Sequence, residues 1–229
     1  MSQNQKTVRP AAGKLLRGNP VVAVLRAGHA SEYAPVIAAL AAGGVTTIEL
    51  TLSTAGVVAQ LPLLLEEFGT AVDIGVGTIT SLAEAVEVMD AGVKFLVTPI
   101  TDLAVVEAAA QRNIPVFPGG LTPTELFAGW NSGATAVKIF PASTMGPGYV
   151  GHLRGPFPSI EVIPSGGVSI DNAPEWIAAG ALAVSLGGPL LGDAFRGGDL
   201  AALTQRARRV TKLVAAAVAA RNAASGAKK

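Results

Sequence analysis

One lysine of this chain lies in the middle of an apolar stretch. Lys138 is flanked by Val137 and Ile139 within residues 134–140, a run typical of a buried strand in a parallel sheet. Burial removes the hydration of an ammonium group and therefore favours the neutral amine. A neutral amine is a nucleophile that can form a Schiff base with a carbonyl substrate. The alternative is a lysine at a strand end whose ammonium group reaches water.

A glutamate is found in similar surroundings. Glu49 lies among apolar and β-branched residues in the run of residues 47–51. Burial raises the pKa of a carboxyl group towards neutral pH, which suits a general base. The alternative is a structural partner of Arg26 or Lys138. A buried lysine and a buried glutamate directed into one cavity would supply a nucleophile and an acid/base group together.

The elements that must position these residues alternate between strand and helix. Glycines that follow helical runs, such as Gly43 and Gly92, are typical of helix ends just before the next strand. The predicted strands are residues 21–26, 46–51, 72–76, 95–98, 116–117, 134–140, 160–164 and 182–186. Helical stretches lie between them, for example residues 32–42, 81–91, 122–130 and 171–179.

Eight such units predict an α/β fold, a single-domain (β/α)₈ TIM barrel, at the compact end of the usual size of about 200 residues or more. A doubly wound sheet would usually carry a glycine-rich dinucleotide loop after its first strand, and the segment 26–29 has none. We expect the barrel to span residues 13–221, with flexible termini at 1–12 and 222–229.

In such a barrel the active site lies at the carboxyl ends of the strands. The polar residues expected there are Arg26, Glu49, Thr51, Thr78, Thr98, Lys138 and Ser165. Two glycine pairs, Gly166-Gly167 and Gly187-Gly188, follow the seventh and eighth predicted strands. The loops at these two positions commonly bind phosphate through backbone N–H groups, although tight turns alone would also account for glycine.

Composition excludes several classes of function. The chain has 229 residues and no cysteine, which excludes disulfides and cysteine-ligated metals. Its net charge of +1 gives no indication of a nucleic-acid or membrane partner. His29 and His152 have no second ligand at a familiar spacing, so we expect neither a metal nor another cofactor. The apolar stretches are too short to span a bilayer, and residues 1–6 lack the apolar core of a signal peptide, which predicts a cytoplasmic protein.

Three motifs together resemble one enzyme family. They are Gly75-Val76-Gly77-Thr78, Val137-Lys138-Ile139-Phe140-Pro141-Ala142 and Pro164-Ser165-Gly166-Gly167-Val168. Over residues 20–191 the chain resembles the 2-keto-3-deoxy-6-phosphogluconate/4-hydroxy-2-oxoglutarate aldolases. The resemblance implies a homotrimeric class I aldolase that cleaves a phosphorylated keto acid, a 2-keto-3-deoxy-6-phospho sugar acid, to pyruvate and glyceraldehyde 3-phosphate. The half-hydrophobic composition also favours apolar surface buried between subunits.

The resemblance also implies a role for each site residue. Lys138 would be the Schiff-base lysine and Glu49 the general acid/base. The substrate-binding residues would be Arg26, Thr78, Ser165, Gly166, Gly167, Gly187 and Gly188.

The chain departs from the gluconate pattern at several positions. Ser53 stands where the gluconate-type enzymes have an arginine, and Arg26 resembles an arginine of the 6-phosphogalactonate type. Ser165 replaces a usual threonine, and Pro189 stands where a phosphate-binding serine is often found. The sugar acid therefore stays open between the two types.

Other functions also stay open from the sequence. One is cleavage of 4-hydroxy-2-oxoglutarate to pyruvate and glyoxylate. Another is a phosphate-binding isomerase or synthase that uses Glu49 and Lys138 without a covalent step. The last is a non-catalytic barrel subunit of a homo-oligomeric assembly.

Overall fold

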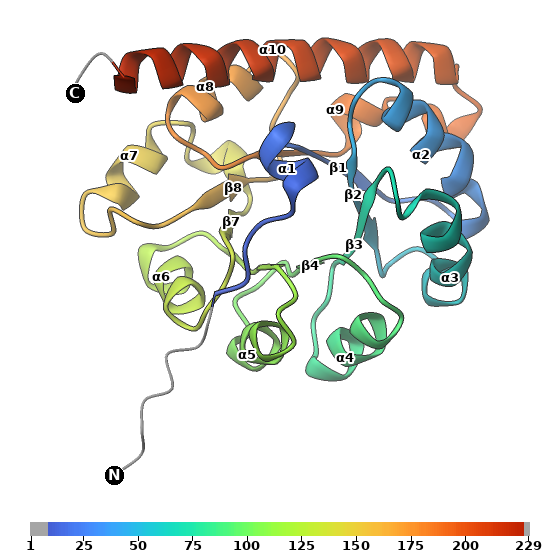
Figure 1. The fold of residues 1–229 in the computed structure, drawn as a ribbon, viewed down its shortest axis with the longest axis horizontal. Helices are drawn as coiled ribbons and strands as arrows, with labels where there is room; N and C mark the ends of the chain where they lie inside the picture. Colours follow the sequence, from blue (N-terminus) through green and yellow to red (C-terminus); the bar gives the residue numbers. More distant parts are fainter. Residues whose placement is uncertain (1–8, 227–229) are drawn as a thin grey trace.

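The computed structural model describes residues 9–226, and its parallel strands are surrounded by helices (Figure 1). The strands are β1 (Val21–Leu25), β2 (Thr47–Thr51), β3 (Asp73–Gly77), β4 (Leu96–Val97), β5 (Val116–Phe117), β6 (Gly119–Gly120), β7 (Val137–Ile139), β8 (Val162–Pro164) and β9 (Val184–Leu186). The helices are α1 (Lys14–Gly18), α2 (Tyr33–Ala42), α3 (Val57–Phe68), α4 (Leu82–Asp90), α5 (Leu103–Gln111), α6 (Pro123–Asn131), α7 (Tyr149–Arg154), α8 (Ala173–Ala178), α9 (Gly188–Leu191) and α10 (Leu200–Gly226). Short 3-10 turns are η1 (Ala30–Glu32), η2 (Ala142–Thr144) and η3 (Ala194–Arg196).

Every strand pair is parallel, which confirms the predicted α/β fold. The ladders form a six-stranded sheet in the order β5-β4-β3-β2-β1-β9 and a three-stranded sheet in the order β6-β7-β8. They are thus two sheets rather than one continuous eight-stranded ring. Pro118, which has no N–H to donate, separates β5 from β6. A parallel bridge between Ser165 and Ser185 links the end of β8 to β9.

Several predicted strands are shorter in the structure. The run 134–140 forms hydrogen-bonded strand only at Val137–Ile139. Before it, the Thr135 hydroxyl bonds to the backbone of Val116 and Pro10, and the Arg9 guanidinium donates to the carbonyl of Ala134. Side chains therefore take the place of part of the ladder. Strand β6 was not predicted, because two glycines carry no strand signal.

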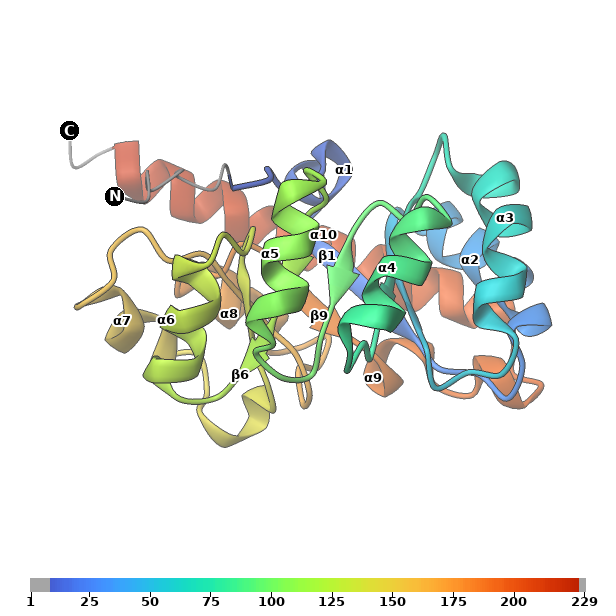
Figure 2. The same ribbon diagram turned by 90° about the horizontal axis from the view of Figure 1, so that it is seen from below.

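Two groups of buried apolar residues hold the elements together. The larger lies between the strands and the outer helices and includes Ile48 and Leu50 of β2. The smaller group faces the opposite side of the strands and combines inward-facing residues of the strands and their flanks with Ala12 and Leu16 from the segment before β1. Its members are Ala12, Leu16, Val22, Phe95, Val97, Phe117, Ala136, Ile163 and Ala183. Leu16 comes from α1, which lies at one end of the strands while α9 lies at the other (Figure 2).

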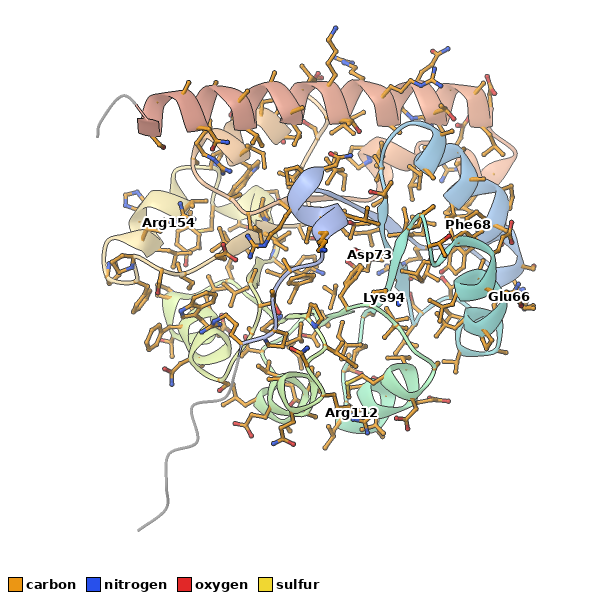
Figure 3. All side chains as sticks on the ribbon, in the orientation of Figure 1. Glu66, Phe68, Asp73, Lys94, Arg112 and Arg154 are labelled. Atoms are coloured by element: carbon orange, nitrogen blue, oxygen red, sulfur yellow. The ribbon has the colours of Figure 1, made fainter. Side chains whose placement is uncertain are left out.

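The α1 end also carries charged residues. Asp73, at the start of β3, lies beside the entry to α1, and a Cβ atom at Gly13 would meet its carboxylate. Burial raises the pKa of Asp73, and the positive charge of Lys94 opposes that rise. Figure 3 labels both side chains, which lie close to each other in that view.

The described structure extends beyond the predicted domain at both ends. The Arg9 guanidinium lies 3.4 Å from the centre of the Trp130 ring, and residues 222–226 continue α10 to Gly226. Helix α10 packs along α8 and α2. Arg9 is thus packed, whereas residues 222–226 are helical but exposed. Residues 1–8 and 227–229 lie outside the described residues, and the domain bounds, 13–221, stay a prediction. No helix within residues 9–226 is long and apolar enough to cross a membrane.

Candidate active site

A cavity of about 440 Å³ opens at the carboxyl ends of the strands, and residues of α9 line part of it. Helix α9 lies at the end of the strands opposite α1 (Figure 2). The cavity lining contains every residue that the sequence predicts to act in catalysis or binding: Arg26, Glu49, Thr78, Lys138, Ser165, Gly166, Gly167, Gly187 and Gly188. Thr51 and Thr98 do not line it. The Thr51 hydroxyl bonds to those of Ser53 and Thr54, and the Thr98 hydroxyl donates to the carbonyl of Ile100.

Lys138 reaches the cavity from β7. Its neighbours Val137 and Ile139 belong to the larger apolar group, between the strands and the outer helices. Because side chains alternate along a strand, Lys138 points to the opposite side, inward. Only 7% of the residue is exposed. Its Nζ lies 5.0 Å from the centre of the Phe140 ring, which also lines the cavity. The amine is therefore held in apolar surroundings but faces a space that a substrate can enter.

Glu49 reaches the same cavity from β2 and is 2% exposed. Burial raises the pKa of its carboxyl group above the usual 4.5, and the positive charges of Lys138 and Arg26 oppose the rise. Strand β3 makes room for this side chain, because a Cβ atom at Gly77 would overlap the Glu49 carboxylate. A carboxyl group with a raised pKa is better suited to accept a proton and return it during a reaction.

Thr78 follows Gly77 with a φ of 63°. A β-branched residue rarely adopts this left-handed conformation, which costs about 1–3 kcal/mol. Thr78 lines the cavity. The strained backbone thus places a hydroxyl-bearing side chain in the cavity wall, directly after the end of β3.

Ser165 and Ser185 form a pair of hydroxyl groups in the cavity wall. Their Oγ atoms lie 3.3 Å apart, and both residues are buried. Ser165 directly follows β8, Ser185 is the middle residue of β9, and the two residues also form a parallel backbone bridge. Ser185 was missed in the sequence, and the available signal was a polar residue two positions before Gly187 in an otherwise apolar strand.

The two glycine pairs differ in their surroundings. Gly166 and Gly167 have φ values of 78° and 88°, and side chains there would meet Phe140 and Ser143. A side chain at Gly188 would meet nothing within 4 Å. Within residues 9–226, the backbone N–H groups of Gly166, Gly167 and Gly187 donate no hydrogen bond. These donors are therefore free to bind a ligand in the cavity.

Two arginines contribute charge at the rim. Arg26, at the end of β1, is exposed and lines the cavity as predicted. Arg196, in η3, lines it as well and was not predicted, because loop arginines are ordinary surface residues in a sequence.

Among residues 9–226, no group of three or more His, Cys, Asp or Glu side chains is placed to hold a metal ion.

Comparison with known proteins identifies the family. The family model for aldolases described as KDPG and KHG aldolase matches residues 13–206. The 2-dehydro-3-deoxy-phosphogluconate aldolase of Dickeya dadantii is 34% identical over 89% of this chain and 96% of its own. The 2-dehydro-3-deoxy-6-phosphogalactonate aldolase of Escherichia coli is 32% identical over 75% of this chain and 84% of its own.

A solved structure is similar as well. The KDPG aldolase of Legionella pneumophila, with pyruvate captured at low pH as a covalent carbinolamine, superposes with a TM-score of 0.79 at 27% identity. The match covers 86% of this chain and 96% of the other. The family match and the names of these relatives identify an aldolase, which is a lyase. The chain belongs to the KDPG and KHG aldolase family.

Proposed function

We propose that this protein is a class I aldolase that cleaves a 2-keto-3-deoxy-6-phospho sugar acid to pyruvate and glyceraldehyde 3-phosphate. The observation that carries the proposal is the meeting of a buried amine, Lys138, and a buried carboxyl of raised pKa, Glu49, in one cavity. The names of the gluconate-type and galactonate-type relatives support the substrate class.

The proposed reaction begins at the C2 ketone of the substrate. The neutral amine of Lys138 attacks this carbon, and Glu49 transfers protons while the carbinolamine loses water. The protonated imine withdraws electrons, and the C4 hydroxyl gives its proton to Glu49 while the C3–C4 bond breaks, which releases glyceraldehyde 3-phosphate and leaves an enamine. Glu49 then helps to protonate the enamine, and hydrolysis releases pyruvate and restores the amine.

Binding in this proposal uses the rest of the cavity wall. Arg26 holds the substrate carboxylate through a charge-assisted hydrogen bond. Thr78 and Ser165 contact carboxylate or hydroxyl groups. The N–H groups of the two glycine pairs face the phosphate, which suits donors that have no partner within the described chain.

We also propose that the strands close into a single (β/α)₈ barrel domain over residues 13–221. Two features support closure. Only Pro118 interrupts the path from β5 to β6, and the Ser165–Ser185 bridge joins β8 to β9. The cavity at the carboxyl ends of the strands also lies where barrel enzymes place their active sites.

A homotrimer is the proposed assembly. Large apolar side chains are exposed at Ile100, Leu103, Phe127 and Met145, and a symmetric interface would bury such surface. Light scattering at micromolar concentration should give about three times the chain mass of 23.0 kDa. A stable, fully active monomer would contradict the trimer.

The predicted cytoplasmic location stays a prediction.

A second candidate substrate is 4-hydroxy-2-oxoglutarate. The family description includes KHG aldolases, and Pro189 contributes neither a hydroxyl nor an N–H group to the loop after β9. A shorter substrate without phosphate would not need these donors. The non-covalent and non-catalytic alternatives are disfavoured by membership of an aldolase family with the lysine and glutamate in place.

Steady-state cleavage tests the proposal. The purified protein is given the phosphogluconate-type acid, its phosphogalactonate-type epimer and 4-hydroxy-2-oxoglutarate, and pyruvate release is measured. The proposal expects one or both phosphorylated acids to have the highest kcat/KM. Preference for 4-hydroxy-2-oxoglutarate would support the second candidate, and release of no pyruvate from any of the three would reject the aldolase proposal.

A further inference from the structure

The cavity carries an excess of positive charge. The ionisable side chains that line it are Arg26, Lys138, Arg196 and Glu49. Even with the Lys138 amine neutral, as the proposed reaction requires, two guanidinium groups face one carboxyl group. A substrate with a carboxylate at one end and a phosphate at the other brings more than one negative charge. Arg26 and Lys138 are already assigned to the carboxylate and the ketone in the proposed reaction. Arg196 remains without a role.

The backbone around Arg196 is held by hydrogen bonds to the carbonyl of Asp193, which also accepts from the N–H of Gly198. The Arg196 N–H donates to the carbonyl of Asp193 at 2.7 Å, and Gly197 follows with a φ of 78°. The preceding Phe195 lines the cavity and packs edge-on against the ring of Tyr33, with centroids 5.9 Å apart. Arg196 is thus an exposed side chain on a fixed turn at the cavity rim.

The guanidinium group has spare hydrogen-bonding capacity. Its Nη2 donates to the carbonyl of Gly192 at 3.3 Å, which uses one of five N–H donors. Arg196 forms no ion pair with any carboxylate of residues 9–226, whereas Arg17, Arg112 and Arg209 each do. A charged fork with free donors is suited to the bidentate binding of phosphate.

The loop between the glycine pair and Arg196 needs such a contribution. Gly187 and Gly188 supply only neutral backbone donors, and Pro189 supplies none. Gly188 begins the short helix α9, and Arg196 lies five residues after the end of that helix. Arg196 lines the same cavity as both glycines. Neutral donors orient a phosphate group, while a cation also compensates its charge.

We propose that Arg196 is a specificity-determining residue that binds the terminal phosphate of the substrate at the rim of the cavity. This inference rests on the proposed function and deepens it. It assigns the two exposed arginines to opposite ends of the substrate, Arg26 to the carboxylate and Arg196 to the phosphate. Loss of Arg196 should therefore affect only phosphorylated substrates.

Paired substrates test this assignment. Wild type, Arg196→Gln, Arg196→Lys and the control Arg208→Gln are compared on a 2-keto-3-deoxy-6-phospho sugar acid and on the same acid without phosphate. Arg208 is an exposed arginine of α10 outside the cavity, so the control removes the same charge elsewhere. Arg196→Gln should lower kcat/KM for the phosphorylated acid about 10- to 100-fold, the range of one hydrogen bond to a charged group, mainly through KM.

For the unphosphorylated acid, Arg196→Gln should change kcat/KM less than about twofold, and Arg196→Lys should recover part of the loss because it keeps the charge. An equal loss on both acids would overturn the assignment in favour of a structural role. An unchanged KM for the phosphorylated acid would overturn it as well.

A binding measurement is independent of turnover. Calorimetric titration with glycerol 3-phosphate, a stable phosphate probe, should show binding to wild type and to Arg208→Gln that Arg196→Gln weakens by a similar factor. Equal binding by all three proteins overturns the role of Arg196, even where cleavage by wild type upholds the aldolase proposal. Weakened binding by Arg196→Gln in a protein that releases no pyruvate upholds the phosphate site and rejects only the aldolase.

Discussion

Two layers of side chains point away from the outer helices, and they differ in chemistry although the same strands supply both. The lower layer, near α1, is apolar, whereas the upper layer lines the cavity. Along three strands the lower and upper residues are two positions apart: Ala136 and Lys138, Ile163 and Ser165, and Ala183 and Ser185.

The comparison separates stability from chemistry. A strand directs every second residue to the same face, so both members of each pair must point the same way. What changes is the distance along the strand from α1, which packs Leu16 into the lower layer. We infer that the lower layer stabilises the fold and that the upper layer carries the reaction, which agrees with the general division of labour in barrel enzymes.

Replacement of the upper-layer lysine, Lys138, should have the largest effect on aldol cleavage. Lys138→Met keeps an unbranched apolar side chain in β7 but removes the amine, so aldol cleavage should fall to the detection limit while the fold is retained. Lys138→Arg should be equally inactive, because arginine is not deprotonated in proteins. Lys212→Met, at an exposed position of α10, is the control for kcat and circular dichroism. Near-normal cleavage by either Lys138 variant would remove the lysine from the mechanism.

The second effect concerns the upper-layer carboxyl group. Glu49→Gln keeps the shape of the side chain but cannot exchange a proton, so kcat should fall by about 10²–10⁴-fold. Slow imine formation with pyruvate should remain, because Lys138 is still present. A loss below about tenfold would make Glu49 a structural partner of Arg26 and Lys138 instead.

The third effect should fall on the lower layer alone. Phe117 is 3% exposed and packs against Phe95 with ring centres 5.6 Å apart. Phe117→Ala should lower the free energy of unfolding by about 3–5 kcal/mol, measured by denaturant titration. At temperatures where the variant is folded, kcat should stay within about twofold of wild type. Unchanged stability with a tenfold loss of kcat would contradict the division between the layers.

The sequence predicted the upper layer better than the lower one. Lys138 and Glu49 were found because ionisable residues inside apolar runs stand out in a single sequence. Ser185 was missed because a small hydroxyl residue is ordinary in a short strand, and its partner Ser165 comes from another strand. The space for Glu49 depends on Gly77 of a neighbouring strand, a relation that only the register between β2 and β3 determines.

Strand bounds were predicted less well, for a related reason. Residues 134–136 are buried and apolar or β-branched like a strand. Their hydrogen bonds nevertheless involve Arg9 and the side chain of Thr135. Apolar patterning reports burial, whereas the ladder depends on which donors and acceptors meet. The parallel α/β fold was predictable because the alternation of strands and helices extends over the whole chain.

The smallest effect is a dependence of stability on pH. The pKa of Glu49 is raised in the folded protein above the unfolded value of about 4.5, because burial disfavours the carboxylate. The folded state therefore binds more protons between the two pKa values, and stability falls as pH rises through that window. Each pKa unit corresponds to about 1.4 kcal/mol. Glu49→Gln lacks this group. The Tm difference, variant minus wild type, should therefore increase as pH rises through the window and stay constant below a pH of about 4.5. A Tm difference that shrinks with rising pH would contradict the raised pKa.

Reductive trapping tests the central claim most directly. Wild type is incubated with pyruvate and sodium borohydride, and the protein is digested and analysed by mass spectrometry. Only an imine can be reduced to a stable adduct, so the account predicts a pyruvate-derived mass increase on the peptide that contains Lys138 and none in Lys138→Met. An adduct on another lysine, or cleavage without any adduct, would contradict a Schiff base at Lys138.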